Sequence, residues 1–196
     1  MLNKKSITRT IRGFLAFPIN SEVKEGLGHI LNDLQQTRAD VKWVQVENLH
    51  LTLKFLGDIE EADLEKISSV ISESCRGFDL ITSHLNEIGV FPDLCHPRIV
   101  WAGLDDSKQK FQSIVEALEE RLAKLEFAKD NHPFKPHITL GRVKSSANLK
   151  DLMQTIQQIT FEGKKEQTFE KIILYKSTLT PQGPIYEVLK EFDIGR

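Results

Sequence analysis

Two short stretches of the sequence carry the same pair of polar residues, a histidine followed two positions later by a threonine. The pairs are His50 with Thr52 and His137 with Thr139. Both are surrounded by apolar residues typical of β-strands, in which side chains alternate between the two faces. Each histidine therefore shares a face with its threonine, while the apolar neighbours point the other way. The pattern predicts two polar pairs on exposed strand faces.

Two imidazoles that face one another can divide the proton transfers of a phosphoryl hydrolysis. One ring takes a proton from water and the other gives a proton to the departing oxygen, so that no metal ion is required. Histidine suits both tasks because its ordinary pKa of about 6.5 keeps both forms populated near neutrality. The threonine hydroxyls would donate hydrogen bonds to the phosphoryl oxygens in the transition state. The residues alone leave open which histidine is the acid.

A single histidine–threonine pair in a strand is more often a partly buried histidine bonded to a neighbour than an active site. The two pairs, however, occupy equivalent places in a weak internal repeat. His137 follows His50 by 87 residues, and Arg98 follows Arg12 by 86, where two apolar runs of strand length begin. Core packing gives no reason to repeat a polar pair, so the repeat favours a paired catalytic role.

Each half of the repeat has the order strand, helix, strand, helix, strand, and the halves extend approximately over 10–92 and 97–192. Ser21 and Ser107 are the expected N-caps of the first helix in each half. Short apolar runs predict the strands, and apolar residues at helical spacing predict the helices. The predicted strands cover 12–17, 50–55, 80–90, 98–103, 137–140, 169–175 and 185–192, and the apolar stripes of the predicted helices cover 23–34, 64–71, 111–122 and 149–156.

This order predicts an α+β protein, a single bilobal domain over 1–196 with two pseudo-symmetric lobes. Each lobe would contain a mainly antiparallel sheet with helices on its outer face, and the active-site cleft would lie between the lobes. A doubly wound parallel sheet would also alternate strands and helices. That fold would place a glycine-rich phosphate loop after the first strand, where this chain has Pro18-Ile19-Asn20.

The composition is that of an ordinary globular chain without strong charge bias. Its 196 residues are 40% hydrophobic, with a formal net charge of −2 and a sequence pI near 6.3. Coating nucleic acid regardless of sequence needs a dense basic surface, so any contact with RNA should be local. Cys75 and Cys95 form no disulfide or metal pattern, and we identify no signal peptide or membrane span. We therefore expect a monomeric cytoplasmic protein with reduced thiols.

The residues around the two pairs resemble the two-histidine phosphoesterase superfamily, and within it the RNA 2',3'-cyclic phosphodiesterases, also called 2'-5' RNA ligases. The first motif region is similar over residues 47–57, with Trp43 ahead of it, and the second is similar over 134–142. The opening segment 12–16 and the closing segment 183–186 are similar as well. The resemblance therefore covers nearly the whole chain.

The resemblance implies a bilobal fold that hydrolyses a terminal 2',3'-cyclic phosphate on RNA, for example on tRNA fragments, to a 2'-phosphate. It implies that His50 is the proton donor to the 3'-oxygen and that His137 is the proton acceptor acting on water. No cofactor and no metal ion are expected. A 5'-hydroxyl in place of water would give the reverse reaction, a 2'-5' ligation of RNA.

Other residues near the motifs are candidates for binding the substrate. Arg142 would offer a fork of donors to the phosphate, but it shares the face of His137 only if a bulge or strand end lies near Gly141; otherwise it is a surface arginine. The expected substrate-binding residues are Thr52, Thr139, Arg142, Arg12, Phe134 and Trp43.

Strict alternation along the strand that begins at His50 has two further consequences. Lys54 would lie on the face of His50, where it could meet the RNA backbone, and Phe55 would lie in the core. The remaining histidines show no spacing that would gather metal ligands on one face. They are His29, His84, His96 and His132.

Two other functions are compatible with these residues. A non-catalytic module that binds RNA ends would keep the cleft but leave the cyclic phosphate unopened, so product analysis would identify it. An enzyme that opens a different cyclic phosphate, such as that of ADP-ribose formed in tRNA processing, would use the same histidines. Competition between that compound and an oligonucleotide would identify this second alternative.

Overall fold

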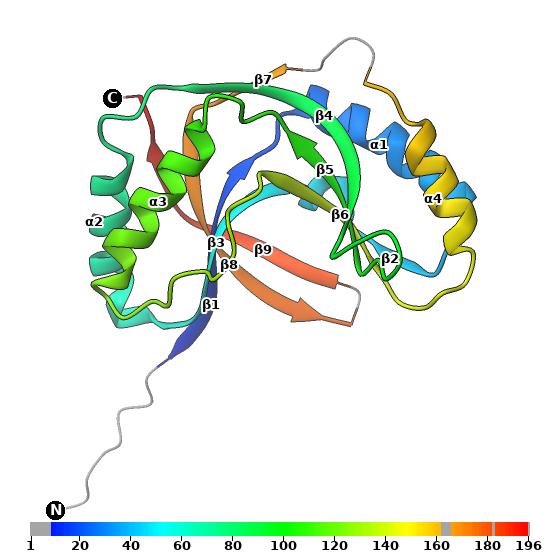
Figure 1. Cartoon of the computed structure of the whole chain (residues 1–196). Coiled ribbons are helices and arrows are strands. Elements are labelled where there is room, and N and C mark those ends of the chain that lie inside the picture. The colour runs from blue at the N-terminus through cyan, green and yellow to red at the C-terminus, as the bar shows by residue number, and fades with distance from the viewer. Residues whose placement is uncertain (1–8, 162–165, 182, 196) are drawn as a thin grey trace, which may run out of the picture.

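The computed structural model describes residues 9–161, 166–181 and 183–195, in which nine strands and four α-helices are formed (Figure 1). The strands are β1 (Thr10–Pro18), β2 (Val41–Trp43), β3 (His50–Glu60), β4 (Ile81–Phe91), β5 (Ile99–Leu104), β6 (His137–Val143), β7 (Glu166–Phe169), β8 (Lys171–Thr180) and β9 (Gly183–Asp193). The helices are α1 (Ser21–Gln36), α2 (Leu64–Cys75), α3 (Lys110–Ala123) and α4 (Leu149–Gln158), with 3-10 turns at Val46–Asn48 and Glu61–Asp63. None of the helices in these described ranges is long and apolar enough to cross a bilayer.

Every strand and helix predicted from the sequence is present, with two differences. The predicted strand 169–175 is divided at Glu170, so that β7 ends before it and β8 begins after it. The short strand β2 was not predicted, because three residues are too few to display an alternating pattern.

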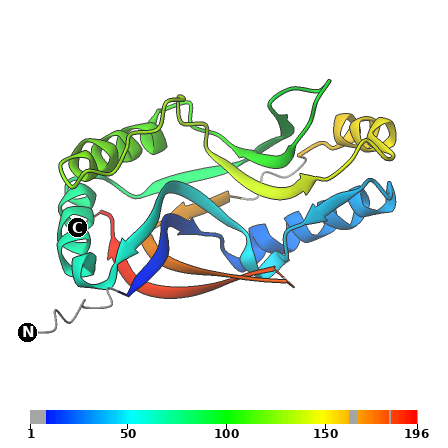
Figure 2. The same cartoon turned by 90° about the horizontal axis from the view of Figure 1, so that it is seen from below.

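The strands form a curled antiparallel sheet in the order β7-β4-β5-β6-β3-β1-β8-β9, with β2 paired to β6. Its middle is a narrow junction, because β3 and β6 share one registered pair, Leu51 with Ile138. Two lobes meet there (Figure 2). One lobe contains β3, β1, β8 and β9, and the other contains β6, β5, β4, β7 and β2. The fold is therefore α+β with two antiparallel lobes, as the sequence predicts.

Each lobe is built from both halves of the chain. β4 lies in the first half but pairs with β5 and β7 of the second. β8 lies in the second half but pairs with β1 of the first. The buried amide of Gln167 in β7 holds the two lobes together, since it accepts from the N–H of Asn20 at 2.9 Å and donates to the carbonyl of Pro18 at 2.7 Å.

The first helix of each half begins at a cap other than the predicted serine. Asn20, not Ser21, caps α1, because the Asn20 Oδ1 accepts a hydrogen bond from the N–H of Val23 at 2.8 Å. In the second half the carboxylate of Asp106, not the hydroxyl of Ser107, accepts from two N–H groups at the start of α3, at 3.0 and 3.1 Å. The negative charge of this carboxylate also suits the positive end of the helix dipole.

A single hydrophobic core extends through both lobes. The helices α1 and α4 lie side by side at one end of the molecule, and α2 and α3 lie side by side at the other (Figure 1). The fully buried rings of Phe17 in β1, Phe111 in α3 and Phe169 in β7 meet edge to face, with centroids 5.1–5.9 Å apart. Because Phe17 and Phe169 come from different lobes, the lobes share this core.

The alternation of side chains along β3 reverses after Thr52. Adjacent residues of β1 pair with Thr52 and with Lys54, so that Leu53 is an extra residue in β3. A β-bulge of this kind turns the following side chains to the opposite faces. As a result Lys54 is buried, at 2% exposure, and Phe55 is exposed, at 64%. Both sequence predictions for these two residues are therefore wrong.

The buried ammonium of Lys54 is paired inside the protein and not directed at the cleft. It donates to Glu119 Oε1 of α3 at 2.6 Å and to the carbonyl of Ala128 at 2.8 Å. The other carboxylate oxygen of Glu119 accepts from the N–H of Asp130 at 3.3 Å. This ion pair joins β3 of one lobe to the helix and the following segment that lead into β6 of the other.

The Lys54–Glu119 pair should contribute strongly to stability. Lys54→Ala leaves the carboxylate without its cation in a largely buried place, so we expect the free energy of unfolding to fall by about 3–5 kcal/mol. Arg121 and Glu73 form a half-exposed pair at 3.0 Å, and Arg121→Ala should cost only about 0.2–1 kcal/mol. Urea unfolding followed by circular dichroism measures both variants. Equal losses in the two would contradict the structural role of Lys54.

Candidate active site

The registered pair at the β3–β6 junction sets the positions of four polar side chains. In an antiparallel pair, the residues that flank a registered pair also face each other across the strands. His50 therefore faces Thr139, and Thr52 faces His137, on the side of the sheet opposite to the buried pair. The histidines lie on one diagonal of this quartet and the threonines on the other, and diagonal neighbours are about 7–8 Å apart. A phosphoryl group could lie among all four.

Both imidazoles are held by the same backbone hydrogen bond. The Nδ1 of His50 lies 2.7 Å from the carbonyl oxygen of Asn48, and the Nδ1 of His137 lies 2.7 Å from that of Lys135. A carbonyl oxygen only accepts hydrogen bonds, so each Nδ1 carries a proton and donates it. The Nε2 of each ring is therefore the atom that gains or loses a proton.

The pKa of each histidine lies below its ordinary value of 6.5, chiefly because the ring is desolvated. The bond to Asn48 raises the pKa of His50, whereas the positive charges of Lys24 and of His137 lower it. The bond to Lys135 raises the pKa of His137, and the ammonium of the same lysine lowers it. Both rings are consequently mostly neutral at pH 7.

Aromatic rings account for the desolvation of the two histidines. Three rings surround His50 with centroids 5.0–6.4 Å from it, and they are Phe14, Tyr175 and Tyr186. Two rings lie beside His137 at 5.1 and 6.3 Å, and they are Phe91 and Trp101. Because these rings pack against the imidazoles, they also restrict the rotation of each ring about its side-chain bonds.

The second motif contains the same bulge as the first. Adjacent residues of β5 pair with Thr139 and with Gly141, so that Leu140 is an extra residue in β6. The irregularity that a functional Arg142 requires is therefore present, and Arg142 lines the same cavity as the quartet. Gly141 also admits the ring of Trp43, since a Cβ atom at this position would lie only 2.7 Å from that ring.

A cavity of about 830 Å³ opens over this face of the sheet. Its lining, within the described residues, contains four cationic side chains and neither Asp nor Glu. The cations are Arg12, Lys42, Arg142 and Lys144. None of the four forms an ion pair with a carboxylate of the described residues. In a chain whose formal net charge is −2, this cavity is suited to an anion.

Most of the residues expected to bind substrate meet at this cavity. Its lining includes His50, Thr52, Thr139, Arg142, Arg12 and Trp43. His137 adjoins it, because it belongs to the same quartet and acts electrostatically on His50. The structure thus brings together residues that are up to 130 positions apart in the sequence.

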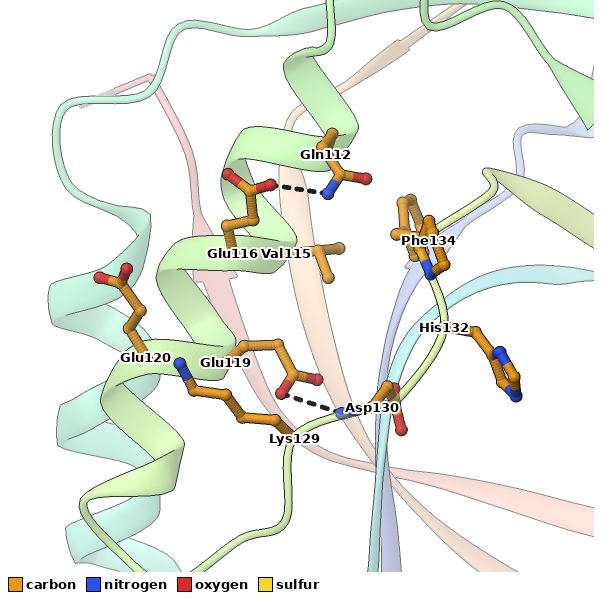
Figure 3. Close-up of a pocket in the computed structure, with 10 residues that line it drawn as sticks. Gln112, Val115, Glu116, Glu119, Glu120, Lys129, Asp130, His132 and Phe134 are labelled. Atoms are coloured by element: carbon orange, nitrogen blue, oxygen red, sulfur yellow. Dashed lines mark hydrogen bonds between the residues drawn. The ribbon is translucent and has the colours of Figure 1, made fainter.

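Phe134 is the exception, and its expected place in the cleft is corrected. It lines a separate hollow of about 260 Å³, where Figure 3 shows its ring beside Gln112 and Val115 of α3. β6 begins only at His137, so the alternation that directs His137 to the cleft does not extend back to Phe134. Although Phe134 is close to His137 in the sequence, its ring does not lie on the face of the sheet that carries His137.

Further residues line the cavity, and the sequence did not indicate that they would lie there. Lys42 lies in the unpredicted strand β2, and Lys144 follows the end of β6. Tyr186 reaches the cavity from β9, whose pairing depends on the exchange of strands between the halves. Phe55 lines the cavity because of the bulge in β3. Alternation within one strand gave no signal for any of them.

The two imidazoles lie among hydroxyl groups and the cationic side chains of the cavity. Among the residues that the structure describes, no three side chains of His, Cys, Asp or Glu lie close enough together to hold a metal ion. The two imidazoles are therefore the groups suited to moving protons near pH 7.

The model of the family described as LigT like Phosphoesterase matches residues 17–101 and, a second time, residues 103–186. The chain is 36% identical over 182 residues to the RNA 2',3'-cyclic phosphodiesterase of Methanocaldococcus jannaschii, covering 93% of this chain and 100% of that one. It is 32% identical over 182 residues to the protein of the same name from Methanothermobacter thermautotrophicus, covering 93% and 98%. The two matches cover successive parts of the chain.

Solved structures have the same fold. The TT0787 protein of Thermus thermophilus superposes with a TM-score of 0.78 at 28% identity, covering 94% of this chain and 98% of that one. LigT of E. coli in its apo form superposes with a TM-score of 0.76 at 22% identity, covering 96% and 100%, a likeness of fold alone. From the two matches of the family model and the relatives above 30% identity, the chain belongs to the LigT-like phosphoesterase family.

Proposed function

We propose that this protein hydrolyses the terminal 2',3'-cyclic phosphate of RNA to a 2'-phosphate by acid–base catalysis with His50 and His137, without a metal ion. The observation that carries the proposal is the quartet itself: two imidazoles with exchangeable Nε2 atoms beside two threonine hydroxyls, over a cavity lined by cations. The names of the relatives, RNA 2',3'-cyclic phosphodiesterases, support the same class of substrate and the opening of the cyclic phosphate.

In the proposed reaction, His137 Nε2 takes a proton from a water molecule as the water oxygen attacks phosphorus. The bond from phosphorus to the 3'-oxygen breaks, and His50 Nε2 gives its proton to that oxygen. The products are a 2'-phosphomonoester and a free 3'-hydroxyl. His137 then carries the proton taken from water, His50 has lost its proton to the 3'-oxygen, and exchange with solvent restores both rings.

The hydroxyls of Thr52 and Thr139 would donate to the two non-bridging oxygens of the phosphate. These hydroxyls are neutral donors that their strands already hold in place. They would therefore stabilise the negative charge that develops on the phosphoryl oxygens in the transition state. Arg142 and Arg12 would add positive charge to the cavity around the substrate, and a guanidinium can form two parallel hydrogen bonds to a phosphate. Trp43 would contact the RNA beside Arg142.

The division of roles between the histidines follows the resemblance to the family. The same hydrogen bond holds both rings, so the quartet alone would serve either direction. With the 5'-hydroxyl of a second RNA in place of water, the same groups would catalyse the reverse reaction, a 2'-5' ligation. The non-catalytic RNA-end module and the ADP-ribose cyclic phosphate remain the alternative functions.

The proposed activity is tested with a nucleoside 2',3'-cyclic phosphate in excess EDTA. We expect undiminished turnover, because no step uses a metal ion, and the product should be the 2'-phosphate. Chromatography against authentic 2'- and 3'-phosphates identifies it. An unopened cyclic phosphate would indicate a binding module, loss of turnover in EDTA would exclude the metal-free mechanism, and a 3'-phosphate would reverse the roles of the histidines.

Each histidine should be needed for the chemical step. His50→Ala and His137→Ala should each lower kcat by about 10²–10⁴, the usual contribution of one positioned proton transfer. Single-turnover rates measure the effect, and circular dichroism verifies that each variant is folded. His29, an exposed histidine of α1 outside the cavity, provides the matched control His29→Ala, which should be unaffected. A near-normal rate in either site variant would contradict the paired mechanism.

The pH dependence should reflect the lowered pKa values of both histidines. The active state carries one proton on the pair, and it is most populated between the two macroscopic pKa values. Both pKa values of the free protein lie below 6.5, so the bell-shaped profile of kcat/KM should have its maximum below pH 6.5. A bound anionic phosphate favours the charged imidazole, so the profile of kcat should lie at higher pH. A maximum of kcat/KM above pH 7 would disagree with this assignment.

A further inference from the structure

The cavity extends in two directions from the quartet. β3 and β6 run antiparallel where they meet, so the residues that follow His50 and those that follow His137 lead away from the junction in opposite directions. After its bulge each strand presents one large side chain to the cavity, Phe55 on β3 and Arg142 on β6. These two positions are equivalent in the repeat, yet one is aromatic and the other is cationic.

The end of the cavity at Arg142 is strongly basic. Lys42 of β2 is registered directly opposite Arg142, and Lys144 follows two residues later on the same side. Neither lysine has an ion-pair partner among the described residues, and no described Asp or Glu lines the cavity. Trp43 lies next to Lys42 in β2, and its partly buried ring packs over Gly141.

The end at Phe55 is different in charge. Its one lining cation, Arg12, is registered opposite Asp58 on β3. The next lysine on that side, Lys176, is already paired with Glu187 at 3.1 Å. Carboxylates beside the cations would repel a phosphate chain there, whereas the three cations of the other end are free to bind one.

The distances along β6 exceed the length of one nucleotide. A strand rises about 3.3 Å per residue, so the backbone of Arg142 lies roughly 10 Å from that of Thr139, the nearest residue of the quartet on β6, and Lys144 lies further still. With the cyclic phosphate at the histidines, as the proposed function requires, Lys42 and Lys144 lie beyond the terminal nucleotide. A chain of further nucleotides would bring its own phosphates to them.

We propose that the RNA strand upstream of the cyclic phosphate leaves the cleft over β2 and β6, where Lys42 and Lys144 bind phosphates of the preceding nucleotides. This inference rests on the proposed function and deepens it, since it names an oligonucleotide end, and not a free nucleotide, as the preferred substrate. The difference in charge between the two ends of the cavity sets the direction in which the RNA leaves. The symmetric quartet alone would not set this direction.

The test compares a nucleoside 2',3'-cyclic phosphate with a short single-stranded RNA that ends in the same nucleotide. The wild-type chain should have the higher kcat/KM on the oligonucleotide, and the ratio of the two values should fall about tenfold or more in Lys42→Ala/Lys144→Ala. For the oligonucleotide, the slope of log(1/KM) against log salt should become shallower by about 1.4, since each phosphate contact on a single strand contributes about 0.7.

The control variant is Lys108→Ala/Lys150→Ala, which removes two exposed lysines outside the cavity and makes the same change in net charge. It should keep both the ratio and the salt slope of the wild-type chain. Arg12→Ala/Phe55→Ala tests the other end of the cavity, and we expect it to keep the preference for the oligonucleotide.

An unchanged ratio in Lys42→Ala/Lys144→Ala would overturn the path over β2 and β6, and so would loss of the ratio in Arg12→Ala/Phe55→Ala alone. Equal losses on both substrates in the double lysine variant would mean that the lysines act on the terminal nucleotide, which also contradicts the inference. If the wild-type chain opened neither substrate, the proposed function itself would fail, and the strand path with it.

Discussion

The candidate site depends on one pair of buried residues at the centre of the sheet, Leu51 and Ile138. Both are fully buried, and burying side chains of this size stabilises a protein by about 1.5–3 kcal/mol each. A slip of one residue in either strand would expose these side chains and turn the polar residues beside them into the core. The hydrophobic contact that joins the lobes therefore also fixes the face on which both histidines and both threonines lie.

The bulges that directly follow the two histidine–threonine pairs are the second constraint, and they act identically on the backbone but differently on the side chains. Each follows a histidine–threonine pair and turns the next two positions over. In β3 the inward position holds Lys54, which requires Glu119 as a buried partner, whereas in β6 it holds Gly141, which leaves room for Trp43. The outward positions are the aromatic Phe55 and the cationic Arg142. A repeated backbone thus carries an unequal set of side chains, and the two ends of the cavity differ as a result.

Local patterns in the sequence predicted the elements and the quartet because periodicity reports which face of a strand or helix is buried. They did not predict the bulge at Leu53 in β3, because neither Leu53 nor Lys54 is a glycine or another residue type that indicates an irregular strand. The exchange of β4 and β8 between the lobes depends on pairing between distant segments, which a pattern within one segment cannot report. The caps were misassigned because Asn20 and Asp106 each adjoin an equally suitable serine, and only the local backbone selects between them.

In the proposed mechanism, the positive charge of the cavity disfavours the positively charged, protonated form of His50 that is needed as the acid. His50 must carry a proton on Nε2 before it can give one to the leaving oxygen, yet burial among aromatic rings and the positive charge of Lys24 lower its pKa and so disfavour the imidazolium. The four lining cations act in the same direction on any added positive charge. The same cations attract the phosphate, whose negative charge then favours the protonated ring. Binding of the anion and protonation of the acid are therefore coupled, and the substrate itself supplies the charge that completes the acid form of His50.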